Sequence, residues 1–333
     1  MPVSSSPPAT VLTPETIEQW AEQVRAGDVR AISRAMTEIE NRSPNAKHLL
    51  QKLFPHTGNS YCIGVTGAPG TGKSTLVDRM AAYYRAKRQT VGVIAVDPSS
   101  PFTGGAILGD RIRMQGHASD SGVFIRSMAT RGSLGGLSQA ASDAALLLDA
   151  AGKKYVLIET VGVGQGEVEI ARLADCTLVV LVPGMGDDVQ NLKAGVMEIA
   201  DVFVLNKADR EGADRFEQQL RAILQLVPER DGWKPPIVLT VATENKGIEE
   251  LARQIGRFRA HFAERRGRNA RENALWKERI INLLREQLTQ RVVDSVVKDG
   301  SLERFAAEVA NRHRDPYSVV AEIMKKTGSE VSH

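Results

Sequence analysis

The segment from Gly67 to Ser74 has the residue types and the spacing needed to hold a chain of phosphates. Its sequence fits the pattern G-x-x-x-x-G-K-[ST], in which glycines let consecutive backbone N–H groups turn inward around an anion. The Lys73 side chain then places a positive charge against the β- and γ-phosphates, and the Ser74 hydroxyl is the expected Mg²⁺ ligand. The predicted phosphate site consists of Gly67, Ala68, Pro69, Gly70, Thr71, Gly72, Lys73, Ser74 and Thr75.

A second segment, "NKAD", has the chemistry to select the base of the nucleotide. The Asp209 carboxylate can accept two hydrogen bonds from the N1–H and 2-amino groups of guanine, whereas adenine offers neither donor and leaves the carboxylate unpaired. The Lys207 stem can cover the base, and Asn206 can connect this loop to the phosphate loop. Asn-Lys is also common in turns, so the prediction depends on the strand that precedes it. The Asp209 carboxylate thus predicts GTP and GDP as the bound nucleotides. In a later loop, "TVATENKG", Ala242 and Thr243 are candidates to offer backbone donors to the guanine oxygen.

The stretch "YVLIETVGVGQGE" places Glu159 and Gly162 where regulatory GTPases carry an Asp-x-x-Gly element. An acidic residue there holds Mg²⁺, usually through water, and the Gly162 N–H can reach the γ-phosphate; the alternative is a charged residue that merely ends a strand. In small GTPases a glutamine that positions water follows this glycine directly. Here Val163 follows and Gln165 comes two positions later. The sequence therefore predicts slow intrinsic hydrolysis that depends on a partner or on a moved loop.

Two further segments are candidates for nucleotide-sensing loops. "AVDPSSPFTGGAILGDRIRM" leaves a strand and lacks a side-chain pattern for packing, which favours a switch whose Mg²⁺ or water contacts are Asp97 and Asp110. Both aspartates are also suited to capping a turn or a helix. "VPGMGDDVQNLKAG" follows another strand and contains Lys193, and the residues alone do not assign it a role. The predicted metal ligands are thus Ser74, Asp97, Asp110 and Glu159.

The apolar runs between these motifs predict the elements that position them. Near-continuous apolar runs separated by helical patterns favour a mostly parallel sheet covered by helices on both faces, an α/β fold that binds nucleotides at the carboxyl ends of its strands. We predict a helical N-terminal extension at 1–58, a P-loop GTPase domain at 59–262 and a helical C-terminal dimerisation arm at 263–333. The predicted strands are Tyr61–Gly67, Thr90–Val96, Val123–Ser127, Tyr155–Glu159, Thr177–Val182, Val202–Asn206 and Ile237–Val241.

The C-terminal arm carries one apolar stripe at helical spacing, formed by Ile281, Leu284, Leu288 and Val292. Such a stripe must pack either on the chain's own core or on a second subunit, and we favour a second subunit. A group of arginines precedes it, and we interpret this group as a solvated helix face in preference to a nucleic-acid site.

Composition limits the remaining classes of function. The chain has 333 residues, 42% hydrophobic residues and a net charge of +3, which is too small to indicate nucleic-acid binding. No apolar run approaches the roughly 18 residues of a membrane span, and the first residues lack the order of a signal peptide. Cys62 and Cys176 are far apart, each in an apolar run, which is typical of buried strand residues and not of a disulfide or a metal pair. We expect a cytoplasmic protein without a membrane partner.

Five of these segments together closely resemble those of the MeaB/ArgK group of P-loop GTPases, the G-protein chaperones of methylmalonyl-CoA mutase. They are the phosphate loop, "AVDPSSPFTGGAILGDRIRM", "ETVGVGQGE", "VPGMGDDVQ" and "NKAD". The resemblance implies a homodimer joined partly through the C-terminal arms. It also implies binding to the adenosylcobalamin-dependent mutase, gating of its cofactor loading, and its protection or reactivation. It makes the Asp97–Asp110 segment the first switch, Glu159 onward the second and Val182–Lys193 the third, so the candidate catalytic residues are Lys73, Asp97, Glu159 and Lys193.

Two other functions share this core. The same group has been described as an ATPase or kinase that acts on an amino-acid transport or binding protein, and Asp209 argues against ATP as its substrate. Related GTPases insert nickel into hydrogenase and urease, and they need clusters of cysteine and histidine that this sequence does not contain.

Overall fold

A computed structural model of the chain describes residues 12–97, 115–117, 119–129, 136–160, 170–171, 173–184, 194–226, 229–264, 267–298 and 300–326. The chain divides into two compact units, Met1–Arg266 and Gly267–His333, and each is described by itself.

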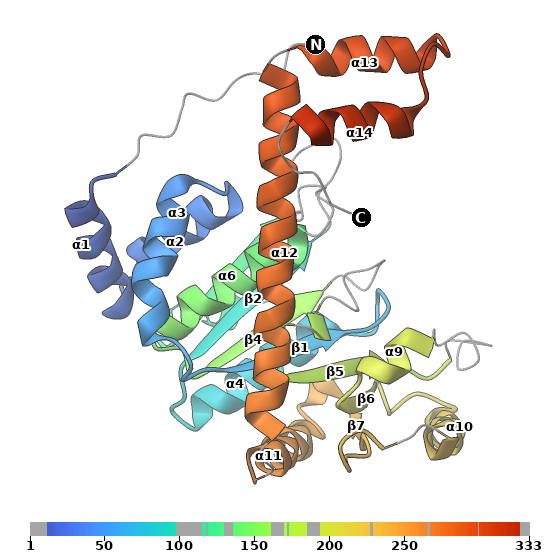
Figure 1. Cartoon of the computed structure of the whole chain (residues 1–333). Coiled ribbons are helices and arrows are strands. Elements are labelled where there is room, and N and C mark those ends of the chain that lie inside the picture. Colours follow the sequence, from blue (N-terminus) through green and yellow to red (C-terminus); the bar gives the residue numbers. More distant parts are fainter. Residues whose placement is uncertain are drawn as a thin grey trace. The chain divides into compact units, whose positions relative to one another are not determined.

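The first unit is built on a parallel sheet of seven strands in the order β3-β2-β4-β1-β5-β6-β7 (Figure 1). Every paired strand is parallel to its neighbours, which confirms the predicted α/β fold. Each of the seven apolar runs forms one strand, because a strand buried on both faces contains few polar residues. The strands are β1 (Tyr61–Thr66), β2 (Val91–Asp97), β3 (Val123–Ala129), β4 (Tyr155–Thr160), β5 (Cys176–Leu181), β6 (Val202–Asn206) and β7 (Ile237–Thr240).

Helices cover both faces of this sheet. On one face α4 (Lys73–Ala86) and α11 (Ile248–Glu264) pack on residues from β1, β5 and β6. On the other face lie α6 (Gly136–Ala150), α9 (Ala194–Ile199) and α10 (Ala213–Leu226). The carboxyl ends of the strands are therefore the edge at which the predicted motifs leave the sheet.

Three N-terminal helices, α1 (Pro14–Arg25), α2 (Val29–Glu40) and α3 (Pro44–Leu53), lie within residues 1–58, for which a helical extension was predicted. Each begins at a residue suited to capping its first turn: the side chains of Thr13, Asp28 and Ser43 accept hydrogen bonds from backbone amides three residues later.

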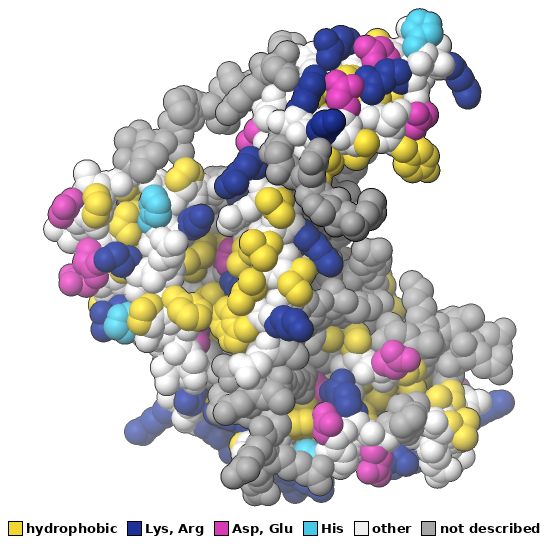
Figure 2. Space-filling view, viewed as in Figure 1, with side chains coloured by type: hydrophobic (Ala, Val, Ile, Leu, Met, Phe, Trp, Pro, Cys, Tyr) yellow, Lys and Arg dark blue, Asp and Glu magenta, His cyan; other side chains and the backbone are white. Residues whose placement is uncertain are grey.

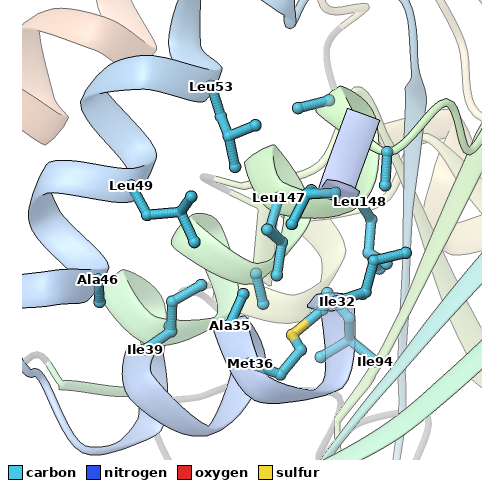
Figure 3. Packing of buried hydrophobic residues seen from close by; sticks show 14 of the residues in the cluster. Ile32, Ala35, Met36, Ile39, Ala46, Leu49, Leu53, Ile94, Leu147 and Leu148 are labelled. Atoms are coloured by element: carbon cyan, nitrogen blue, oxygen red, sulfur yellow. The ribbon is translucent and has the colours of Figure 1, made fainter. Parts of the chain in front are cut away.

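The N-terminal helices form a further layer on α6. Figure 3 shows side chains of α2 and α3, including Met36 and Leu49, interleaved with Leu147 and Leu148 of α6. At the edge of the sheet, Arg126 of β3 donates to Glu40 of α2 at 2.6 Å. The N-terminal helices thus share one hydrophobic core with α6 and the strands beneath it.

A buried carboxylate anchors the linker between these helices and β1. Asp149 of α6 accepts hydrogen bonds from the backbone amides of Gly58, Asn59 and Ser60, at 2.6, 3.2 and 2.9 Å. Hydrogen bonds to an ionised acceptor are stronger than neutral ones, so this contact fixes the chain where it enters the sheet.

We expect Asp149→Asn to destabilise the first unit by about 2 kcal/mol, because the amide keeps one acceptor oxygen and loses the charge. A lower urea midpoint of unfolding would show this. Asp214→Asn, at an exposed position in the first turn of α10, is the matched control. An unchanged midpoint in Asp149→Asn would mean that the linker contact contributes nothing to stability.

The two cysteines form no disulfide with each other: Cys62 is on β1 and Cys176 on β5. Ile63, not Cys62, is the register partner of Cys176, and the two side chains belong to cores on opposite faces of the sheet. Burial raises the pKa of the Cys62 thiol well above its usual value.

The second unit consists of α12 (Gly267–Lys298), α13 (Ser301–Ala310) and α14 (Pro316–Lys326). Its small core is formed by Val296, Phe305 and Val319, one from each helix. The side chains of Leu284 and Leu288 on α12 remain 54% and 53% exposed, and Figure 2 shows hydrophobic side chains gathered along this helix. No helix in the described ranges combines the length and the apolar character that crossing a membrane requires.

Candidate nucleotide-binding site

The predicted phosphate loop connects the end of β1 to the start of α4 and has the backbone shape that its glycines allow. Gly67 and Gly72 have φ values of 142° and 91°, in the region that side chains disfavour. A Cβ on Gly67 would lie 2.2 Å from the carbonyl oxygen of Val180, and one on Gly72 would lie 2.5 Å from Nδ2 of Asn206. The loop therefore tolerates no side chain at these two positions.

Lys73 begins α4 and lies beneath the loop. Its Nζ donates to the backbone oxygens of Gly67 at 2.8 Å and Ala68 at 3.0 Å, and the residue is buried. Thr71, also buried, donates from its hydroxyl to the same Ala68 oxygen. The ammonium group thus lies next to the backbone that is expected to bind the anion, at the N-terminus of a 14-residue helix.

Ser74 and Glu159 come together across the sheet end, although 85 residues separate them. The Ser74 hydroxyl donates to Oε1 of Glu159 at 2.6 Å, and both residues are buried. A hydroxyl and a carboxylate are the hard oxygen donors that Mg²⁺ prefers, and Mg²⁺ takes its remaining ligands from water and substrate phosphates. The donor set present here therefore fits the predicted metal.

Asn206, the last residue of β6, connects three loops. Its Nδ2 donates to the Thr71 carbonyl at 2.8 Å, which agrees with the predicted contact to the phosphate loop. Its Oδ1 accepts from the Thr240 hydroxyl at 3.0 Å and from the Ala242 amide at 3.2 Å. The Ala242 amide therefore donates to Asn206, whereas the sequence interpretation gave it the guanine oxygen as acceptor.

The side chains that follow Asn206 are the candidates for contact with the base. Lys207, at a φ of 56°, donates from Nζ to the Gly70 carbonyl at 2.7 Å, so its stem crosses from one loop to the other. Asp209 is exposed. A hydrogen bond from Lys246 to Glu244 raises the pKa of the Lys246 ammonium, and Asp209 adds a smaller electrostatic contribution. Asp209 thus lies near the loop that holds Ala242.

Four predicted site residues lie wholly or partly outside the described residues. Asp97 is the last residue of β2, and its side chain is outside the description. Asp110, Gly162 and Lys193 lie outside the described residues altogether. Pro69 lies in the phosphate loop and Thr75 in the first turn of α4. In the part of the chain that is described, no cluster of three histidine, cysteine or acidic residues could hold a metal ion.

Sequence reasoning missed three threonines at this edge: Thr240, which donates to Asn206, and the pair Thr66 and Thr160. The Thr160 hydroxyl donates to the Thr66 hydroxyl at 3.0 Å, and both residues are buried. Each is the last residue of its strand, next to a glycine-containing motif. This position at the end of a strand is the signal that the sequence offers for a role at the site. It does not reveal which side chains contact each other.

The family model described as "Methylmalonyl Co-A mutase-associated GTPase MeaB" matches residues 32–297. The match covers the described phosphate loop, Glu159, the Asn206 loop and most of α12.

The sequence similarity to known proteins extends over most of the chain. The chain is 49% identical to a putative GTPase of Pyrococcus abyssi over 93% of this chain and 96% of that protein. It is 35% identical to the GTPase ArgK of Escherichia coli, over 87% and 89% respectively. Among solved structures, that of a LAO/AO transport system kinase is 27% identical, with a TM-score of 0.69 over 96% of this chain and 100% of that one.

Proposed function

The chain belongs to the MeaB family of methylmalonyl-CoA mutase-associated GTPases, and we propose that this GTPase acts in the cytoplasm as a G-protein chaperone of an adenosylcobalamin-dependent methylmalonyl-CoA mutase. In this proposal it binds the mutase, gates the loading of its cofactor, and protects or reactivates it. The observation that carries the proposal is the family match over residues 32–297.

The described residues supply some of the parts that hydrolysis of GTP needs. In-line attack of water on the γ-phosphate spreads negative charge over its oxygens, so catalysis consists largely of positioning and charge stabilisation. Lys73 and the backbone N–H groups of the phosphate loop are the candidates to stabilise that charge. Asn206 ties the base-binding loop to the phosphate loop, so a guanine bound through Asp209 fixes the position of its phosphates.

We assign the metal role to Ser74 and Glu159, with Asp97 and Asp110 as further candidates. Magnesium, when bound, would neutralise charge on the β- and γ-phosphates. The Ser74 hydroxyl donates to the Glu159 carboxylate, so the two oxygens lie side by side at the sheet end.

The partner is tested by GTP hydrolysis measured with purified protein, before and after methylmalonyl-CoA mutase is added. We expect slow turnover that the mutase accelerates, because the residue after Gly162 is Val163 and not a glutamine. ATP, measured in parallel, should be inert. An unchanged rate with a mutase that forms no complex in gel filtration would contradict the partner proposal and leave the GTPase intact.

A second candidate function follows from the likeness to the LAO/AO transport system kinase, whose solved structure has a TM-score of 0.69. A kinase acting on a transport or binding protein would pass the γ-phosphate to that protein. Radiolabelled GTP and ATP distinguish the two: label recovered as inorganic phosphate supports the GTPase role alone, whereas label retained on a binding protein supports the kinase.

We also propose that the chain forms a homodimer through α12. Leu284 and Leu288 are exposed in the second unit, and exposed leucines one helical turn apart favour burial against another apolar surface.

The double variant Leu284→Glu/Leu288→Glu is expected to be monomeric, because two carboxylates in an apolar interface lose their hydration. Sedimentation or light scattering gives the mass. Gln287→Glu, at an exposed polar position of the same helix, should leave a dimer intact. A dimer that persists in the double variant would place the interface elsewhere.

A further inference from the structure

The buried hydroxyl pair of Thr66 and Thr160 lies where both phosphate-site strands leave the sheet. β1 continues into the phosphate loop at Gly67, and β4 ends directly after Glu159. The two hydroxyls are 3.0 Å apart, with exposed fractions of 0% for Thr66 and 5% for Thr160. Neither lies among the residues assigned to the nucleotide or the metal.

Strand pairing shows what this contact adds. The register between β1 and β4 runs from Tyr61 with Tyr155 to Val65 with Glu159 and ends there. Beyond that point, Thr66 pairs with β5 and Thr160 pairs with β2, on opposite sides. The hydroxyl pair is therefore a side-chain link that continues the β1–β4 connection by one residue after the backbone pairing has ended.

The link between Thr66 and Thr160 and the contact between Glu159 and Ser74 lie on opposite faces of the sheet. Successive side chains of a strand point to opposite faces. Val65 and Glu159 point toward α4, where Glu159 meets Ser74. Thr66 and Thr160 point to the other face, with Ile158 and the core that contains α6. The link thus holds the strand ends from behind the residues that it positions.

From this arrangement we infer that Thr66 and Thr160 are positioning residues, which hold Glu159 against Ser74 so that both oxygens meet one magnesium ion. The inference rests on the proposed metal role of Ser74 and Glu159. Without the link, Thr160 is paired with β2 alone, so β4 loses its connection to the phosphate-loop strand directly after Glu159, where the backbone pairing with Val65 is the last one.

The test measures how strongly Mg²⁺ slows the dissociation of a fluorescent GDP derivative, by comparing the rate in Mg²⁺ with the rate in EDTA. Thr160→Val keeps the shape and removes the hydroxyl. We expect the slowing by Mg²⁺ to fall by roughly 2- to 12-fold, the equivalent of one hydrogen bond. The rate in EDTA should stay at the wild-type value, because the nucleotide contacts themselves do not change. Thr160→Ser keeps the hydroxyl and should retain the wild-type effect.

The double variant Thr66→Val/Thr160→Val separates positioning from stability. Either single variant leaves one buried hydroxyl without its partner, which lowers stability. The double variant removes both, so its melting temperature should recover toward wild type while the effect of Mg²⁺ stays weakened. If Mg²⁺ slows GDP dissociation in the double variant as strongly as in the wild type, the inference is overturned. This result decides the question even where a single variant does not fold.

Two further variants test the proposed magnesium site itself, so that its failure can be distinguished from a failure of the positioning role. Ser74→Ala and Glu159→Gln should each reduce the slowing by Mg²⁺ more than Thr160→Val does. If they leave it unchanged, the magnesium site is wrong, and the role given to the threonines is wrong with it. If they reduce it and both threonine variants do not, the site stands and the positioning role fails.

Discussion

Replacement of Lys73 by alanine is expected to slow GTP hydrolysis by roughly 10²- to 10³-fold, the range found when one preorganised donor to a developing negative charge is removed. The lysine is buried and its Nζ already lies against the phosphate loop, 2.8 Å from the Gly67 oxygen, so its charge acts in a site with little water. A charge–charge interaction there is stronger than one on the surface. Single-turnover hydrolysis with saturating GTP measures the chemical step without the effect on binding.

Lys87→Ala is the matched control, because Lys87 is the exposed C-cap of the same helix. It should hydrolyse GTP at the wild-type rate. Since Lys73→Ala also removes one donor from each of the Gly67 and Ala68 carbonyls, the melting temperature of the variant should be measured together with its rate. A folded Lys73→Ala protein with wild-type turnover would remove Lys73 from the catalytic residues.

Asp209→Asn is expected to weaken GTP binding by roughly 10²-fold or more, because sites that hydrogen-bond a polar edge discriminate strongly against a lost partner. The carboxylate accepts from two donors of guanine, whereas an amide presents one acceptor and one donor group. Xanthine carries a carbonyl in place of the 2-amino group. The variant should therefore prefer XTP to GTP, reversing the wild-type order, as measured by competition against a fluorescent nucleotide.

Asp214→Asn serves as control for this variant, since Asp214 is exposed and five residues further along the chain. It should bind both nucleotides as the wild type does. Equal affinities for GTP in Asp209→Asn and wild type would show that another group reads the base, and the assignment of the "NKAD" loop would fail.

The parts of the site that were predictable from sequence are those that depend on the residue types within one short segment of the chain. A phosphate loop needs glycines, lysine and serine at fixed spacing, so eight consecutive residues specify it. The strands were predictable because a parallel sheet buried on both faces turns each strand into an apolar run. The contact of Asn206 with the phosphate loop was also foreseen, and the structure gives its acceptor as Thr71.

Contacts that depend on the register between distant strands were not predictable. Thr66 and Thr160 lie 94 residues apart, and a shift of one residue in either strand would turn one hydroxyl to the other face. The acceptor of the Ala242 amide likewise depends on how β6 and β7 pair, and that pairing brings Asn206 beside Thr240. In both cases the residue types are compatible with several hydrogen-bond partners, and the register of the strands selects one of them.

The dependence of the N-terminal helices on α6 has a consequence for biosynthesis. α1 to α3 leave the ribosome before α6, their packing partner, which ends at Ala150, roughly a hundred residues after the end of α3. At typical rates of translation, that interval lasts about 5–20 s. During it, the apolar faces of three helices have only each other to cover them. We therefore expect the newly made N-terminal segment to be a substrate for the cell's own folding factors.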